Sequence, residues 1–167
     1  MQTSGRDDAA VDAFLVASRA LVGVAAQSLA DVDITLPQYR ALIVLWTRPG
    51  VTVTDLAEAL DIHASTATRM CDRLARKQLV RRTQGTADRR ATELRLAAAG
   101  RRLVERVTDR RRRAIAAITA TLSPDVTAAA VAALDAFARA AGEPTGVDLF
   151  GWDDGAVGQP VTAAPPV

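Results

Sequence analysis

The arginines and lysines are the residues of this chain whose type and spacing point to chemistry. Sixteen of the 21 lie between Arg69 and Arg113, together with only 5 of the 19 acidic residues. This segment carries a net charge of +11 and the rest of the chain −9, although the whole chain carries only +2. Ordinary solvated helix faces would mix the signs instead. The clustering indicates a surface that binds a polyanion, and we expect double-stranded DNA.

One set of candidate contacts lies on a predicted helix from Ala64 to Lys77. Its apolar positions, Ala67, Met70, Cys71 and Leu74, share one face at helical spacing. The opposite face carries the candidate DNA-binding residues Ser65, Thr66, Thr68, Arg69, Arg73, Arg76 and Lys77. We expect the first four to meet base edges in the major groove and the last three to meet phosphates.

A second set lies in the loop that follows. The segments 79–83 and 92–96 alternate with a period of two and predict a β-hairpin. Its loop carries Asp88, Arg89 and Arg90, which we expect at the DNA. An ordinary salt-bridged surface loop is the alternative for these residues. A basic hairpin directly after two short helices is typical of a winged helix-turn-helix.

Local signals predict the helices that position these residues. Apolar periodicity predicts helices over about 8–30 and 98–121. Capping boxes are expected at Thr35 and Thr52, and Ser123-Pro124-Asp125 predicts the start of a last helix, which ends before Gly142. The expected fold is mainly α with a small β-hairpin wing. The expected domains are an N-terminal dimerisation helix (1–34), a winged helix-turn-helix (35–97), C-terminal dimerisation helices (98–142) and a flexible tail (143–167).

No residue set suggests an enzyme or a bound cofactor. The sequence has no zinc-ligand spacing, phosphate-binding glycine loop or Ser/His/Asp set. The single histidine, His63, precedes the Ala64–Lys77 helix, where it would cap the helix or contact DNA. The single cysteine, Cys71, falls on the apolar face and is expected to pack there.

The chain is expected in the cytoplasm, without a membrane partner. Its first ten residues lack the basic segment of a signal peptide. No uninterrupted apolar stretch approaches the ~20 residues that span a bilayer. A lone cysteine fits a reducing compartment.

The sequence resembles the MarR (multiple antibiotic resistance regulator) family of winged-helix regulators. The resemblance rests on Leu36-Pro37-Gln38-Tyr39-Arg40-Ala41-Leu42, Thr54-Asp55-Leu56-Ala57, Ser65-Thr66-Ala67-Thr68-Arg69-Met70, Asp72-Arg73-Leu74, Leu79-Val80-Arg81-Arg82 and the wing signature Asp88-Arg89-Arg90. It spans roughly residues 8 to 142 in the right order and spacing. Two positions depart from the family pattern. Gln78 stands where the family usually has a left-handed Gly, and Ala97 stands where it favours a Ser or Thr cap.

The resemblance implies a homodimer that binds a pseudo-palindromic operator, with repression as the commoner mode. It also implies that Arg90 enters the minor groove while Asp88 braces the loop. A small aromatic or anionic effector would bind between the dimer helices and the winged domain, where Phe14, Tyr39 and Trp46 are candidate lining residues. Packing in the core is the alternative for these three aromatic residues. Two roles are possible for Arg110–Arg113. One or two of these side chains contact DNA or a ligand, or they form ion pairs across the dimer.

Two alternatives remain open for the function. One is a winged helix that binds a protein partner, and the other is a non-specific DNA-binding protein without an effector. An enzyme that uses the winged domain as an accessory is disfavoured, because the remaining 25 residues are too few to build an active site.

Overall fold

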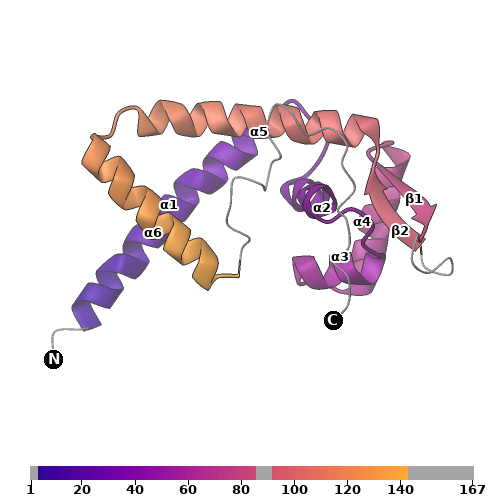
Figure 1. Ribbon diagram of the computed structural model, residues 1–167, viewed down its shortest axis with the longest axis horizontal. Helices are drawn as coiled ribbons and strands as arrows, with labels where there is room; N and C mark the ends of the chain where they lie inside the picture. The colour runs from indigo at the N-terminus through magenta and orange to yellow at the C-terminus, as the bar shows by residue number, and fades with distance from the viewer. Residues whose placement is uncertain (1–3, 86–91, 143–167) are drawn as a thin grey trace, which may run out of the picture. The chain divides into compact units, whose positions relative to one another are not determined.

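The computed structural model describes residues 4–85 and 92–142. The chain forms two compact units, Met1–Leu122 and Ser123–Val167, and each is described by itself. The first unit contains α1 (Ser4–Ser28), α2 (Leu36–Thr47), α3 (Val53–Leu60), α4 (Ala64–Arg76), β1 (Val80–Gln84), β2 (Thr92–Leu96) and α5 (Ala98–Thr119), and the second contains α6 (Pro124–Ala140). The fold is mainly helical with a two-stranded wing, as predicted (Figure 1). The predicted boundaries at 34/35 and 97/98 stay predictions, and the predicted tail lies outside the described residues.

The predicted capping residues start the helices. Thr35 and Gln38 form a reciprocal capping box at the start of α2, and Thr52 and Asp55 form another at the start of α3. Hydrogen bonds from the Thr52 backbone and side chain lower the pKa of the Asp55 carboxyl below its usual value. The Ser123 hydroxyl accepts from the Val126 N–H at the start of α6. Each cap satisfies a backbone N–H that has no partner within the helix.

The wing is an antiparallel hairpin whose register runs from Val80 opposite Leu96 to Gln84 opposite Thr92. A bridge between Val51 and Leu94 attaches the α2–α3 connection to β2. Gly50 precedes that bridge with φ 90°, and a Cβ there would lie 3.0 Å from Glu93 Oε2. The wing is therefore attached to the helix-turn-helix twice: by the chain that runs from α4 into β1, and by the bridge between the α2–α3 connection and β2.

The core of the first unit is built mainly from aliphatic side chains of α2, α3, α4, the wing and the first half of α5. Tyr39 on α2 is also buried there, and its hydroxyl hydrogen-bonds to Thr108 Oγ1 on α5 at 2.8 Å. This bond satisfies two buried polar groups and fixes α2 against α5. The winged domain and α5 consequently share one continuous core.

The turn from α4 into the wing is tightly constrained. Gln78 adopts φ 56°, so it takes the left-handed conformation that the resemblance to the family anticipated. The next residue, Leu79, approaches α5 so closely that a Cβ on Gly100 would lie 2.1 Å from the Leu79 carbonyl oxygen. Ala97 caps α5 without a side-chain hydrogen bond, again as expected.

The long first helix departs from one expectation. Within the described residues, Asp8–Ser28 is long and apolar enough to cross a membrane, with a mean hydropathy of 1.7 and 6% of the window buried. The exclusion of such a segment was therefore wrong by length and composition, because it required an uninterrupted apolar run. A helix of this kind near the N-terminus is weak evidence for a membrane, since core helices and signal sequences share these properties.

Candidate nucleic-acid interface

The helix-turn-helix fixes which face of α4 points outward. Asp61 adopts a left-handed conformation after α3, and the Ile62 N–H donates to the Ala57 carbonyl, so the turn into α4 is short. On α4, Ala67, Cys71 and Leu74 are almost completely buried. The opposite face exposes the predicted contacts Ser65, Thr68, Arg69, Arg73 and Arg76, with Thr66 half-buried.

Three arginines on this face have no ionic partner in the part of the chain that the structure describes. Within residues 4–85 and 92–142, Arg69, Arg73 and Arg76 have no ion pair and no side-chain hydrogen bond to the protein. They lie at i, i+4 and i+7 along a single helix, so their positive charges line one side of it. Unpaired guanidinium groups keep their donors for phosphates and for guanine edges.

The side chains of Lys77 and Thr68 both have partners within the protein. The Lys77 ammonium pairs with the Asp33 carboxylate at 2.9 Å and also donates to the Asp33 carbonyl. This contact ties the α1–α2 connection to the end of α4. The Thr68 hydroxyl donates to the Ala64 carbonyl at 2.9 Å, which leaves its oxygen as an acceptor only. Phosphate binding by Lys77 stays a prediction, and it would require exchange of the Asp33 partner.

His63 occupies the N-cap position of α4 but makes no side-chain capping bond. The predicted capping role of His63 was therefore wrong, and DNA contact stays a prediction. The His63 carbonyl instead accepts from the Thr66 N–H at 2.9 Å and from the Ala67 N–H at 3.1 Å, so backbone alone closes the first turn of α4.

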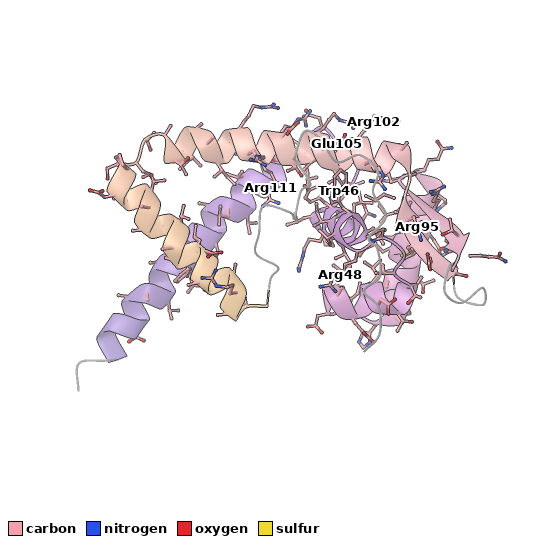
Figure 2. The ribbon with its side chains drawn as sticks, in the orientation of Figure 1. Trp46, Arg48, Arg95, Arg102, Glu105 and Arg111 are labelled. Carbon is pink, nitrogen blue, oxygen red and sulfur yellow. The ribbon has the colours of Figure 1, made fainter. Side chains whose placement is uncertain are left out.

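The wing strands contribute two arginines that the sequence reasoning did not select. Arg81 is exposed on β1 and lies opposite Arg95, which pairs with Glu93 at 2.7 Å. Arg82 pairs with Asp72 on α4 at 2.7 Å and so links the wing to the recognition helix. Alternation along β1 could have identified only one of them, because neighbouring side chains in a strand point to opposite faces, whereas both are exposed here. Figure 2 shows Arg95 on the hairpin.

The tip of the wing carries the remaining predicted contacts. Asp88, Arg89 and Arg90 lie outside the described residues. Their roles at the minor groove remain proposals.

The four consecutive arginines of α5 have different environments. Arg110 pairs with Asp31 in the α1–α2 connection at 2.8 Å, whereas Arg112 and Arg113 are exposed. Arg111 is half-buried, and its Nε lies out of solvent without a hydrogen-bond partner in the part of the chain that the structure describes. Figure 2 shows Arg111 on α5 where that helix passes α1. The ion pair of Arg110 is thus formed within one chain.

The three candidate effector-binding aromatics also differ. Tyr39 is 2% exposed and bonded to Thr108, so its position favours a role in packing. Trp46 is half-buried beneath α5, and the Arg101 guanidinium lies 5.8 Å from its ring centroid (Figure 2). Phe14 is half-buried on α1. An effector role for Phe14 and Trp46 is compatible with their partial exposure and stays a prediction.

The Cys71 side chain packs in the hydrophobic core. It is 1% exposed within the core, and burial raises the pKa of its thiol, against a smaller lowering effect of Arg82. A raised thiol pKa and poor access both suppress the reactive thiolate. Among the described residues, no group of three or more His, Cys, Asp or Glu side chains could hold a metal ion.

Comparison with known proteins agrees with this geometry. The sequence profile of the MarR family matches residues 34–92, which contain the helix-turn-helix and the wing. The chain is 38% identical to RV1404 from Mycobacterium tuberculosis, covering 83% of this chain and 95% of that one with a TM-score of 0.76. A MarR family protein from Bacillus stearothermophilus superposes with a TM-score of 0.75 at 25% identity, covering 83% and 98% of the two chains.

The chain belongs to the MarR family. It is also 33% identical over 81 residues to the organic hydroperoxide resistance transcriptional regulator of Bacillus subtilis, which covers 48% of this chain. The chain spans about half the length of the curated relatives it matches, 55% in this case. MarR family members are transcriptional regulators of the helix-turn-helix type rather than enzymes.

Structures of the similar protein MepR from S. aureus contain two kinds of ligand. A single-residue variant of MepR was solved with an oligodeoxyribonucleotide, with a TM-score of 0.60 and 26% identity over 78% of this chain and 96% of that one. Another MepR structure contains ethidium bromide, with a TM-score of 0.59 and the same identity over 78% and 95% of the two chains.

Proposed function

We propose that this protein is a sequence-specific DNA-binding transcriptional regulator that acts as a homodimer. The observation that carries the proposal is the row of Arg69, Arg73 and Arg76 on the outward face of α4, next to a basic wing. Among the described residues, none of the three has an ion-pair partner. The oligodeoxyribonucleotide bound to the similar protein MepR supports it. Ser65, Thr66, Thr68 and Arg69 are proposed to read bases, while Arg73, Arg76 and Lys77 hold phosphates.

The dimer is proposed because α1 presents an apolar face without a partner in the described chain. Val11, Leu15 and Val22 share one side of α1 and are each more than half exposed. A second copy would cover this surface and would place two recognition helices about 34 Å apart on a pseudo-palindromic operator. A cytoplasmic location follows from access to DNA.

We propose repression as the mode of regulation, with a small aromatic or anionic effector that relieves it. The ethidium bromide bound to the similar protein MepR supports an effector response. Phe14 and Trp46 are the half-buried aromatics proposed to contact the effector, and Arg111, whose Nε lacks a partner among the described residues, is a further candidate. An effector acts by favouring a dimer whose recognition helices no longer match the operator spacing.

The direct test is fluorescence anisotropy on a duplex from the upstream region of the gene, against a scrambled duplex. We expect at least a hundredfold preference for the native duplex, and a steep loss of affinity between about 0.05 and 0.2 M salt. Equal, salt-sensitive binding to both duplexes would indicate a non-specific DNA-binding protein. Absence of binding to either would favour a protein-interaction module.

Three substitutions sharpen this test. Arg69→Ala should weaken specific binding by about 1–3 kcal/mol, because it removes a contact to a base. Arg76→Ala should weaken native and scrambled binding alike and reduce the salt slope by about 1, because it removes a phosphate contact. Arg106→Ala, an equally exposed arginine on α5, is the matched control and should change neither.

A further inference from the structure

The chain contains a single lysine among its 21 basic residues, and that lysine is Lys77. It is the C-cap residue of α4 and follows Arg73 by four positions, and its backbone N–H donates to the Arg73 carbonyl at 3.1 Å. Arg69, Arg73 and Lys77 therefore follow one another at helical spacing and form one row along α4. The two arginines have no ion pair among the described residues, whereas Lys77 is paired with Asp33.

Asp33 meets the Lys77 ammonium with two oxygen atoms. Its carboxylate Oδ2 lies 2.9 Å from Lys77 Nζ, and its backbone carbonyl accepts a hydrogen bond from the same nitrogen. An ammonium is a compact charge with three rotatable N–H donors, so it can serve two such acceptors at once. A phosphate group also offers several anionic oxygens to one cation. Asp33 therefore occupies Lys77 in the way that a DNA phosphate would.

The backbone around Asp33 is held in place. The Ile34 N–H donates to the Val32 carbonyl at 2.9 Å, which makes Asp33 the central residue of a tight turn, and the Val32 N–H donates to the Leu29 carbonyl at 3.0 Å. Leu29 and Ile34 are both buried in the core. The Asp33 side chain itself is 98% exposed and that of Lys77 is 32% exposed. The acid is thus fixed beside Lys77, while the pair stays accessible to an incoming phosphate.

An exposed ion pair of this kind is weak enough to be exchanged. Solvent screens its attraction, so such a pair adds little to the stability of the fold. DNA presents a dense row of negative charges, and each phosphate that a cation contacts releases counterions into solution. A duplex can therefore displace Asp33 from Lys77. Part of the gain from the phosphate contact is lost, because the contact with Asp33 must first be broken.

We propose that Asp33 is a built-in competitor for phosphate at Lys77, which lowers the affinity of the protein for DNA of any sequence. In the free protein Asp33 holds the last cation of the Arg69–Arg73–Lys77 row, and a backbone phosphate replaces it when DNA binds. This inference rests on the proposed DNA binding and deepens it, because it names a residue that weakens the contact. That residue belongs to the α1–α2 connection, in which positions 29–35 carry no basic residue.

The first test compares variants by fluorescence anisotropy at about 0.05 M salt, on the native and the scrambled duplex. Asp33→Asn removes the competing charge and should tighten binding to both duplexes about two- to fivefold, the size expected for an exposed ion pair. Asp31→Asn is the matched control. It removes the same charge from the same connection, but Asp31 pairs with Arg110 on α5 at 2.8 Å, so binding should stay nearly unchanged.

A second background separates competition at Lys77 from a general effect of charge. Lys77→Gln removes the contested ammonium and should weaken binding to both duplexes, because a phosphate contact is lost. In this background Asp33→Asn should no longer tighten binding, since no ammonium remains to be released. The difference between the two backgrounds is the coupling between Asp33 and Lys77.

The same exchange can be followed by NMR at a single atom. Because Lys77 is the only lysine, labelling lysine with ¹⁵N at Nζ gives one side-chain signal. We expect Asp33→Asn to shift this signal in the absence of DNA, because the ammonium loses its carboxylate partner. Saturating duplex should shift the signal of the wild-type protein, because a phosphate replaces Asp33.

Three results would overturn the proposal. They are unchanged or weaker DNA binding by Asp33→Asn, an equal gain from Asp33→Asn in the Lys77→Gln background, and a Lys77 signal that saturating duplex leaves unchanged. All three are observed with a wild-type protein that binds DNA. Failure of the proposed function is seen in the wild type itself, as equal binding to the two duplexes or binding to neither, so the two failures are distinguishable.

Discussion

Gln78 adopts a backbone conformation that lowers the stability of the protein, yet the fold accommodates it. It ends α4 with φ 56°, a conformation in which a side chain is disfavoured relative to glycine. The compensation comes from its neighbours, since the Gln78 and Leu79 N–H groups donate to the Ala75 and Leu74 carbonyls. These bonds close the helix despite the strain.

Gln78→Gly should therefore stabilise the protein by about 1 kcal/mol, because it removes the cost of the left-handed conformation. Urea denaturation followed by circular dichroism measures this change. Gln84→Gly is the matched control on β1, where the same substitution should destabilise because glycine weakens a strand. A loss of stability in both variants would show that the Gln78 side chain makes a favourable contact.

The Cys71 thiol should react slowly in the folded protein. It is 1% exposed, and burial raises the pKa of the thiol. We expect a thiol-disulfide reagent such as DTNB to modify native protein far more slowly than urea-unfolded protein. Equal rates in the two states would contradict the packing assignment.

The same raised pKa predicts the pH dependence of stability. In the unfolded chain the thiol ionises with a pKa of about 8.5, below its folded value. The unfolded state therefore loses its proton first, and stability should fall as the pH rises above that value. Cys71→Ala should remove this contribution, which a comparison of unfolding curves at neutral and alkaline pH would detect.

At the scale of the elements, Gly100 marks the tightest contact between the wing connection and α5. A Cβ there would lie 2.1 Å from the Leu79 carbonyl oxygen, which accepts from the Ala97 N–H. Backbone must move to admit any side chain at this position. The start of α5 is thus held in contact with the end of the recognition helix.

Gly100→Ala should destabilise the protein by more than about 2 kcal/mol, because overpacking against backbone cannot relax through a side chain. Gly23→Ala is the matched control, since nothing lies within 4 Å of the added methyl group. That change, within α1, should stabilise by about 0.5–1 kcal/mol through helix propensity. Thermal unfolding of both variants gives the comparison, and equal effects would refute the steric argument.

The elements themselves were largely predictable, for local reasons. The capping boxes at Thr35 and Thr52 and the start at Ser123 depend on residues within three positions of each other, and all three formed as expected. The period-two pattern predicted a hairpin of 79–83 with 92–96, and the structure pairs 80–84 with 92–96, one residue later on the first strand. The membrane exclusion for α1 failed because it ignored the average hydropathy of a helix interrupted by few charges.

At the scale of the whole molecule, the exposed apolar side of α1 predicts self-association. Leu15 is 57% exposed and Val22 56%, on the same side of the helix. We expect Leu15→Lys to convert a dimer into a monomer and to weaken operator binding strongly, because a monomer contacts only one half-site. Light scattering coupled to size-exclusion chromatography measures the mass.

Gln27→Lys is the control for this prediction. Gln27 is exposed on α1 but lies away from the Val11–Leu15–Val22 side, so the charge should leave the dimer intact. A wild-type protein that is monomeric at all concentrations, or an unaffected Leu15→Lys dimer, would show that this face has another role.

The candidate site was predicted in part. Charge clustering and the helical period placed Arg69, Arg73 and Arg76 on one outward face, because both signals are read from neighbours in the chain. The structure alone showed that Lys77 is paired with Asp33, that Arg82 is paired with Asp72, and that Tyr39 is bonded to Thr108. These partners lie 44, 10 and 69 residues away.

There is a physical reason why some features could be predicted from the sequence while others, such as the partners of Lys77, Arg82 and Tyr39, could not. Caps and hydrophobic periodicity act over a few residues, and net charge is a sum over the chain. The family, the fold class and the exposed basic face of α4 therefore follow from the sequence alone. Whether a cation is free or a tyrosine is open to ligand depends on which distant side chain arrives beside it. The Tyr39–Thr108 hydrogen bond is of the second kind, since α2 and α5 form it only after they have packed together.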